Sequence, residues 1–363
     1  MFLRSPLLLW ALASLFLLSC SEDDSYVPVV EPEQVSPVVF DLATVPYQNL
    51  SQYNFFDGAM AEMNPVYGVM PYELINPLFT DYAKKKRFVW MPSDVSASFS
   101  GDHMVLNFPV GTVLIKNFYY NNVLPSGDTR VIETRLMINK PEGWVFANYV
   151  WNEEQTDAVM DLNGSFLSFE WEDTGITRSV NYRIPAGPEC HTCHKIGEMP
   201  IPIGPKPQNF NKSYNFKDGA MNQLQKMIDL GYLDDNLPDD INTLSAWNDP
   251  NASLNDRARA YIDINCAHCH QEEAHCAYRP VRFNYDATGD DGNLGVCVEP
   301  DTDLGVGLTH IVSPSNNFRS VMYYRINSTD EAVRMPLLGR TIIHEEGAEL
   351  IFEWINSINT TCE

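Results

Sequence analysis

The 363-residue sequence is poor in positive charge and in long apolar runs. It has 24 Lys and Arg against 48 Asp and Glu, a formal net charge of −24, which argues against nucleic-acid binding and favours basic docking partners. The one marked apolar run, residues 7–18, is too short to span a bilayer. No group of acids, bases and nucleophiles has the pattern of a catalytic site, so the sequence does not predict hydrolytic chemistry.

The first 20 residues do have a recognisable form. Arg4 and the apolar run lead into Leu17-Leu18-Ser19-Cys20, which resembles a bacterial lipoprotein signal. The resemblance implies that residues 1–19 are removed and that Cys20 is lipidated, so the protein is tethered to the cell envelope. An ordinary secretory peptide is the alternative.

Residues 20–37 follow as an acidic segment with proline and no helical or strand period, which predicts a flexible tether. The acidic cluster beside Cys20 resembles the surface-export signal of Bacteroidetes lipoproteins. It implies an outer-membrane location, on the surface or on the periplasmic face.

Histidine is scarce, with 8 in the chain, yet two of them complete a motif. Residues 190–194 and 266–270 each read C-x-x-C-H, the spacing at which two thiols on one helical turn attach to a haem. The motifs therefore predict two covalent c-type haems. Cys190 and Cys193 would hold one haem, Cys266 and Cys269 the other, and His194 and His270 would bind the two irons.

The cysteine pairs have two alternative uses. A four-cysteine zinc site usually has its two pairs fifteen to twenty residues apart, whereas a much longer segment separates Cys193 from Cys266. A thioredoxin-like dithiol favours a βαβ setting, and no such alternation surrounds either motif. Haem attachment is the better interpretation.

Residues 38–186 are rich in predicted strands with turn residues at intervals of about ten, which favours a β-sandwich-like module. The expected strands are residues 87–91, 105–108, 112–120, 131–138, 144–151, 166–171 and 180–184. Four tryptophans in this module are candidates for a glycan-binding surface or, more ordinarily, for its core. They are Trp90, Trp144, Trp151 and Trp171.

Within this module, residues 72–88, 108–112, 132–136 and 149–152 resemble the N-terminal module of a family of dihaem c-type cytochrome lipoproteins of Gram-negative, Bacteroidetes-like envelopes. The likeness extends over nearly all of the chain after the tether. It implies a β-rich N-terminal module and a C-terminal domain like that of class I cytochrome c, and it assigns no reaction.

Residues 187–250 form the expected first haem module, a thin one with a helix predicted at residues 217–230. The second iron ligand of this haem is left open. Candidates are Met199, Met221, Met227, His103, another group, or an open position.

Residues 251–363 have the order helix, haem motif, loop, methionine loop and helix, which resembles a class I cytochrome c domain. A helix opens at the capping residue Ser253, and another begins at His344 with an acidic first turn. In this resemblance the second ligand comes from the loop before the last helix, which implies Met335. A thioether ligand raises the reduction potential.

Two more cysteines, Cys276 and Cys297, bracket a loop rich in Asp, Gly and Asn, and a disulfide between them is the first expectation. The acidic residues of the loop do not match the EF-hand spacing for calcium. The state of Cys362 is left open.

The expected fold is a multi-domain α+β chain with a β-rich module, a small haem module and a helical haem domain. The expected function is an envelope-anchored dihaem cytochrome that takes electrons from a redox protein or dehydrogenase and passes them to another carrier. The alternatives are a dihaem peroxidase-like enzyme with an open first haem, and a surface module that binds glycan or protein.

Overall fold

The structure is a computed structural model that describes residues 34–305 and 307–362. The predicted signal peptide, Cys20 and most of the tether lie outside the described residues. Helices and strands are both present, which confirms the mixed α+β class. None of the helices in the described part of the chain has the length and apolarity needed to cross a membrane.

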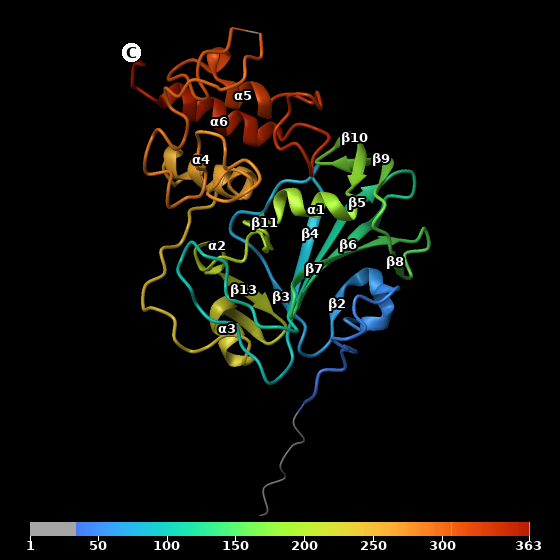
Figure 1. Ribbon diagram of the computed structural model, residues 1–363. Coiled ribbons are helices and arrows are strands. Elements are labelled where there is room, and N and C mark those ends of the chain that lie inside the picture. Colours follow the sequence, from blue (N-terminus) through green and yellow to red (C-terminus); the bar gives the residue numbers. More distant parts are fainter. Residues whose placement is uncertain (1–33, 306, 363) are drawn as a thin grey trace, which may run out of the picture. The chain divides into compact units, whose positions relative to one another are not determined.

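The β-rich part forms one antiparallel sheet of eight strands, with the order β10-β9-β5-β6-β7-β8 (Figure 1). β4 pairs with the first part of β5, on the edge that β9 meets near Val123, and β3 pairs with β4. The eight strands are hydrogen-bonded into this one sheet, whereas a β-sandwich has two facing sheets. The strands are β3 (Met70–Tyr72), β4 (Lys84–Trp90), β5 (Val113–Val123), β6 (Asp128–Lys140), β7 (Gly143–Trp151), β8 (Ala158–Met160), β9 (Ser165–Asp173) and β10 (Ile176–Ile184).

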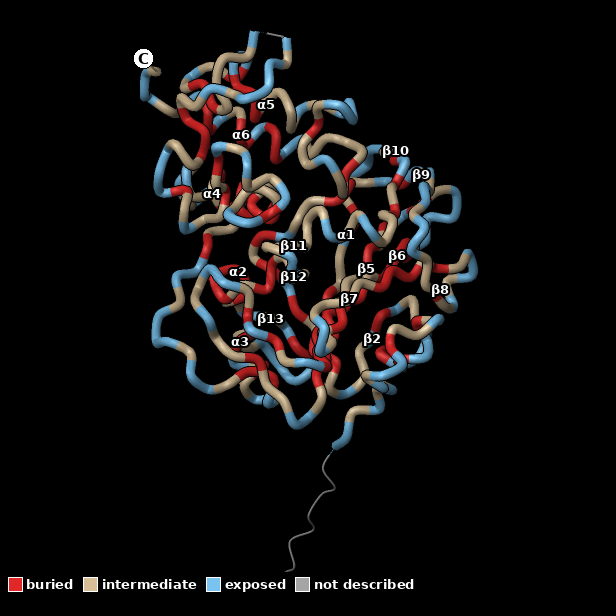
Figure 2. Tube along the Cα trace, viewed as in Figure 1, coloured by how far each residue is buried: buried red, intermediate tan, exposed pale blue. Residues whose placement is uncertain are grey.

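Both faces of the sheet are covered, which is why β4 and β5 are apolar at successive positions. Phe88 and Ile115 pack on one side, in a cluster completed by the segment before β3, and Val89 and Leu114 pack on the other. Figure 2 shows the buried residues gathered along these strands. Three of the four tryptophans, Trp90, Trp151 and Trp171, are buried, and Trp144 is partly buried. These side chains therefore form core and leave little aromatic surface for a glycan.

Short elements precede and follow the sheet. Before it lie η1 (Leu50–Tyr53), β1 (Phe56–Asp57), η2 (Met60–Glu62) and β2 (Asn64–Pro65). After it come α1 (Gly187–Cys193), β11 (Lys195–Ile196), β12 (Met199–Pro200), α2 (Pro207–Phe210), β13 (Ser213–Phe216), β14 (Gly219–Asn222) and α3 (Gln223–Asp229). The helix expected at residues 217–230 is therefore correct only in its second half.

The C-terminal part is helical, as expected. It contains α4 (Leu254–Ile262), the π-helical turn η3 (Asp263–Ala267), η4 (Asn317–Arg319), α5 (Val321–Ile326) and α6 (Glu345–Ser357). The side chain of Ser253 caps α4 by accepting a hydrogen bond from the backbone N–H of Asp256, and His344 is the N-cap residue of α6. Both predicted helix starts are confirmed.

Residues 76–82 link the sheet to segments much later in the chain. The Asn76 side chain donates to the Ser245 carbonyl over 2.9 Å and accepts from the Trp247 N–H over 2.7 Å. Buried Asp81 accepts from the N–H and the hydroxyl of Thr341, over 2.6 and 3.0 Å. The chain from Ser36 onward packs as one compact unit. The domain boundaries expected near residues 186 and 250 stay predictions.

Candidate haem sites

The first C-x-x-C-H motif is the short helix α1. It places Cys190 and Cys193 one turn apart, and His194 follows as the C-cap residue, with its N–H donating to the Cys190 carbonyl over 2.9 Å. The His194 Nδ1 lies 2.9 Å from the Ile201 carbonyl oxygen. A hydrogen bond there fixes Nδ1 as the protonated nitrogen and leaves Nε2 free to bind a metal. Burial lowers the pKa of His194 to about 4, so the ring is in the neutral, ligating form at pH 7.

The second motif follows α4 directly, through the π-helical turn. The N–H groups of Cys269 and His270 both donate to the Cys266 carbonyl, each over 3.1 Å, so this motif is also a helical turn. Burial lowers the pKa of His270 to about 4. Its Nδ1 is buried and has no hydrogen-bond partner among the described residues.

Each motif turns both cysteines and its histidine toward a cavity. The first cavity encloses about 1390 Å³ of space, part of it open to solvent, and is lined by Cys190, Cys193 and His194. The second encloses about 1270 Å³ and is lined by Cys266, Cys269 and His270. The donor set at each motif, two cysteines and a histidine that line one cavity, fits a haem.

The two motifs, far apart in the sequence, are in contact. The Cys193 and Cys269 Sγ atoms lie 4.0 Å apart, and the Cys269 Sγ lies 3.6 Å from the Thr192 carbonyl oxygen. The hydrogen bond from the Cys269 thiol lowers the pKa of Cys193. His268 lines both cavities. One ring nitrogen of His268 and the sulfurs of Cys193 and Cys269 all lie within 4.8 Å of one another.

These three residues are a second candidate for a zinc site, with two cysteines and a histidine as donors in place of the four cysteines considered from the sequence. The long segment between the motifs was a poor argument against it, because the fold brings Cys193 and Cys269 together. The cluster has three donors, however, and structural zinc sites have four. A zinc site would also leave Cys190 and Cys266 without a role. Haem attachment uses all four cysteines, so it fits the donor set better.

Met335 lines the second cavity together with His270, as the expected second iron ligand must. Its loop is held by Arg340, which is 4 % exposed. The Arg340 guanidinium donates to the Met335 carbonyl over 2.8 and 3.0 Å, and the Met335 N–H donates to the Arg325 carbonyl over 3.0 Å. Arg340 also donates to the carbonyl groups of Arg325, Ile326, Ser328 and Ile342.

None of the four candidate second ligands of the first haem lines the first cavity. Met199 is 60 % exposed, Met221 and Met227 pack in the core beside the sheet, and the side chain of His103 is 44 % exposed and lies near Asp286. The second ligand of the first iron would therefore be another group, or that position would be open.

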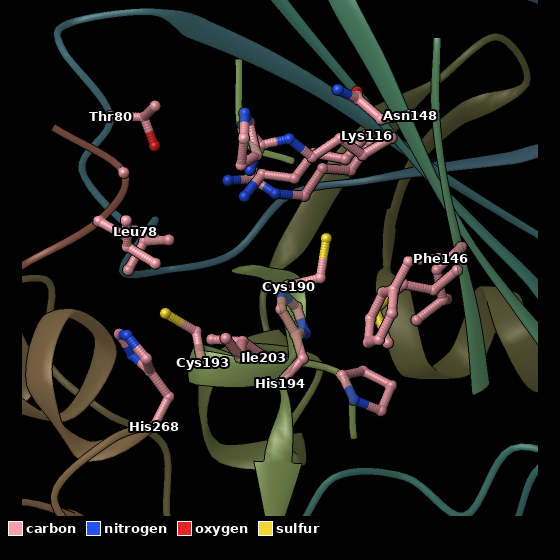
Figure 3. A pocket seen from close by; sticks show the side chains of 18 of the residues that line it. Leu78, Thr80, Lys116, Phe146, Asn148, Cys190, Cys193, His194, Ile203 and His268 are labelled. Carbon is pink, nitrogen blue, oxygen red and sulfur yellow. The ribbon is translucent and has the colours of Figure 1, made fainter. Parts of the chain in front are cut away.

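Sequence reasoning missed the wall that the sheet contributes to the first cavity. Arg87, Lys116, Arg135 and Asn148 lie directly opposite one another on β4, β5, β6 and β7, and all four line this cavity. Figure 3 shows Lys116 and Asn148 across the cavity from His194 and Cys193. The run of basic residues 84–87 in an acidic chain was the signal that could have indicated this wall.

The disulfide expectation was wrong in its pairing. Cys297 is bonded to Cys362, and Cys276 is a free thiol. The Cys276 N–H donates to the Cys269 carbonyl over 2.9 Å, and Cys276 lines the second cavity. Cys276 therefore lies beside the second C-x-x-C-H motif. The sequence provided no sign that the chain after α6 returns to Cys297.

Comparison of the chain with protein-family models, curated proteins and solved structures found no match. The resemblance to a family of dihaem cytochromes therefore stays a prediction. The function of the chain must be inferred from its own residues.

Proposed function

We propose that this protein is an envelope-anchored dihaem c-type cytochrome that carries electrons between redox partners. The observation that carries the proposal is the pair of C-x-x-C-H turns, each of which presents two cysteines and a neutral histidine to one large cavity. Haem bound there supplies a one-electron iron couple.

The contact between the two motifs supports a relay. Because the Cys193 and Cys269 sulfurs lie 4.0 Å apart, the two attachment edges are neighbours in the folded chain. The protein's own groups then set the properties of each site. His194 and His270 would supply imidazole nitrogens to the two irons, and Met335 would supply a thioether to the second. The sheet and the loop around residue 336 both line the first cavity.

The proposal includes attachment through a lipid on Cys20, with an outer-membrane location on either face. The partners would be a redox protein or dehydrogenase as donor and another carrier as acceptor. A net charge of −24 favours partners with a basic docking surface.

A dihaem peroxidase-like enzyme is the second candidate, and one observation favours it. Because Met199, Met221, Met227 and His103 all lie away from the first cavity, the first iron would have an open position unless another group binds it. The spin state of ferric protein separates the two functions. Two low-spin centres support the carrier, and one high-spin centre supports the enzyme.

Haem attachment itself is tested by two double variants of the full-length protein. Cys190→Ala with Cys193→Ala, and Cys266→Ala with Cys269→Ala, should each keep one of two covalent haems, measured by haem staining and by absorbance per chain. Zinc content by elemental analysis is the matching control. A wild-type protein with zinc and no covalent haem would overturn the proposed function.

A further inference from the structure

The row of basic residues on the sheet carries more positive charge than the protein neutralises. Arg135 donates to Glu133 with its Nε over 3.0 Å, and Glu133 also accepts a hydrogen bond from the Tyr182 hydroxyl over 2.6 Å. On another wall of the same cavity, Arg183 forms an ion pair with Glu189. Glu133 and Glu189 are therefore already paired with other arginines.

Arg87 and Lys116 have no such partner. Arg87 is 6 % exposed, and its Nη2 is buried with no hydrogen-bond partner among the described residues. Lys116 lies with its Nζ 4.8 Å from the centroid of the Phe118 ring and makes no ion pair within the described part of the chain. Burial lowers the pKa of Lys116 well below its usual value, with the Arg87 charge adding to the effect.

Asn148, at the other end of the row, also has an amide without hydrogen-bond partners. Asn148 is 3 % exposed, and both its Nδ2 and its Oδ1 are buried without a partner among the described residues. Burying a cation or an amide without a partner costs several kcal/mol, on the order of 2–7 for a neutral polar group and more for a charge. A wall of this kind is stable when an anion lies against it.

The positions of the two unpaired cations indicate which anion. The helix α1 contacts β7, whereas Lys116 and Arg87 lie on β5 and β4, two and three strands further across the sheet. At a strand spacing of about 4.8 Å, they are on the order of 10–14 Å from β7. A c-type haem is attached by its vinyl edge and carries two propionate carboxylates at the opposite edge. Arg87, which is buried, and Lys116, which is partly buried, lie on strands away from α1 and match these two carboxylates in number and place.

We infer that Arg87 and Lys116 bind the propionates of the haem held by Cys190 and Cys193, with the Asn148 amide as a further polar group on the same wall. The inference rests on the proposed function. It makes the sheet a part of the first haem site and explains why the short segment around α1 has so little structure of its own. Arginine suits the role because its guanidinium binds a carboxylate through two parallel hydrogen bonds.

The test is redox titration of full-length holoprotein carrying Arg87→Met or Lys116→Met. Removing a nearby positive charge favours ferric over ferrous iron, so each variant should lower one of the two midpoint potentials and leave the other unchanged. Arg87→Lys keeps the charge and should restore most of the shift. Lys84→Met removes a charge from an exposed position of the same strand and is the matched control; it should move neither potential.

Haem staining of each variant distinguishes a failure of the propionate assignment from a failure of the proposed function. If two covalent haems are present and both potentials in Arg87→Met and Lys116→Met equal those of Lys84→Met, the propionate assignment is overturned while the proposed function stands. If wild-type protein lacks a haem at the first motif, the proposed function itself fails.

A diffusible anion is the other source of the same chemistry. Sulfate and acetate should leave the absorption spectrum and potentials of the wild type unchanged when propionates already occupy the site. A saturable response to either anion that disappears in Arg87→Met and Lys116→Met would overturn the assignment in favour of an open anion site. Should Arg87→Met fail to fold, Lys116→Met and Arg87→Lys provide the same comparison.

Discussion

The backbone of Met335 is held on both sides: its N–H donates to the Arg325 carbonyl, and its carbonyl accepts from the guanidinium of buried Arg340. Because Arg340 is nearly inaccessible and donates to five carbonyl groups, the loop around Met335 has little freedom. This rigidity suits a ligand that must stay at a set distance from a metal.

We predict that Met335→His lowers one midpoint potential, on the order of a hundred millivolts or more, while the haem stays low-spin. The reason is that an imidazole stabilises ferric iron more than a thioether does. Redox titration followed by absorbance measures the change.

Met335→Leu is the packing control for this experiment, since leucine has a similar volume and no ligand atom. It should give a five-coordinate or water-bound ferric haem with little loss of stability. Unchanged potentials in Met335→His together with a fully low-spin Met335→Leu would make Met335 a core residue.

At the residue scale, the sequence indicated that the cysteines and histidines of each motif share a helical turn, but not which other side chains line the cavities beside them. The cysteines and histidines of both motifs line cavities because their spacing fixes a helical turn. Arg87 and Lys116 were not predicted as site residues, because their contribution depends on the register between β4 and β5, and no local pattern encodes that register.

Among the elements, those with strong local signals were predicted best. The capped helix α4 and the amphipathic helix α6 begin where the sequence indicated, because cap and periodicity are local properties. Residues 105–108 were expected as a strand and instead form an irregular segment with one bridge, Ser98 to Asn107. Residues 219–222 pair as β14, since tertiary pairing overrides a weak helical period.

The N-terminus of α6 joins the helical part to residues 76–82 through a buried histidine. The His344 ring stacks on Phe79, with centroids 4.1 Å apart, and its Nδ1 lies 3.0 Å from the Tyr261 hydroxyl. Burial lowers the pKa of His344 to about 4. The Glu346 carboxylate, 3.6 Å from Nε2, opposes the shift, while the charges of Lys85 and Arg340 add to it.

This histidine should make the fold sensitive to acid. Between pH about 6.5, the value of an unfolded histidine, and pH about 4, the unfolded chain binds the proton and the folded chain does not. Stability is therefore full above pH 6.5 and falls as the pH decreases, by up to about 3 kcal/mol from this residue. Urea unfolding of wild type and His344→Gln at several pH values measures the difference. Parallel pH profiles for the two proteins would show that His344 is not the cause.

At the scale of the whole molecule, contacts between distant segments decide the site. Cys193 meets Cys269, Asp81 binds Thr341, and Cys297 is bonded to Cys362 across a separation of 65 residues. None of these contacts can be deduced from local spacing, which explains why the disulfide was mispaired. The fold class was predictable from composition and periodicity, whereas these junctions were not.

The cysteines as a set provide the last prediction. The chain has 8 cysteines, and the proposal assigns four to thioether bonds, Cys20 to a lipid, and Cys297 with Cys362 to a disulfide, which leaves Cys276 as the single free thiol. Thiol titration of denatured, unreduced holoprotein should therefore find one thiol per chain, and peptide mapping should locate it at Cys276.

The disulfide closes a long loop, so Cys362→Ser should lower the free energy of unfolding by about 2–5 kcal/mol. Cys276→Ser serves as the matched control because it removes a thiol and no cross-link; its unfolding free energy should stay close to that of the wild type. Three free thiols in the native protein, with label on Cys297 and Cys362, would show that the cross-link does not form. A bridge from Cys276 to Cys297 would instead leave Cys362 as the labelled residue and reverse the effects of the two serine variants.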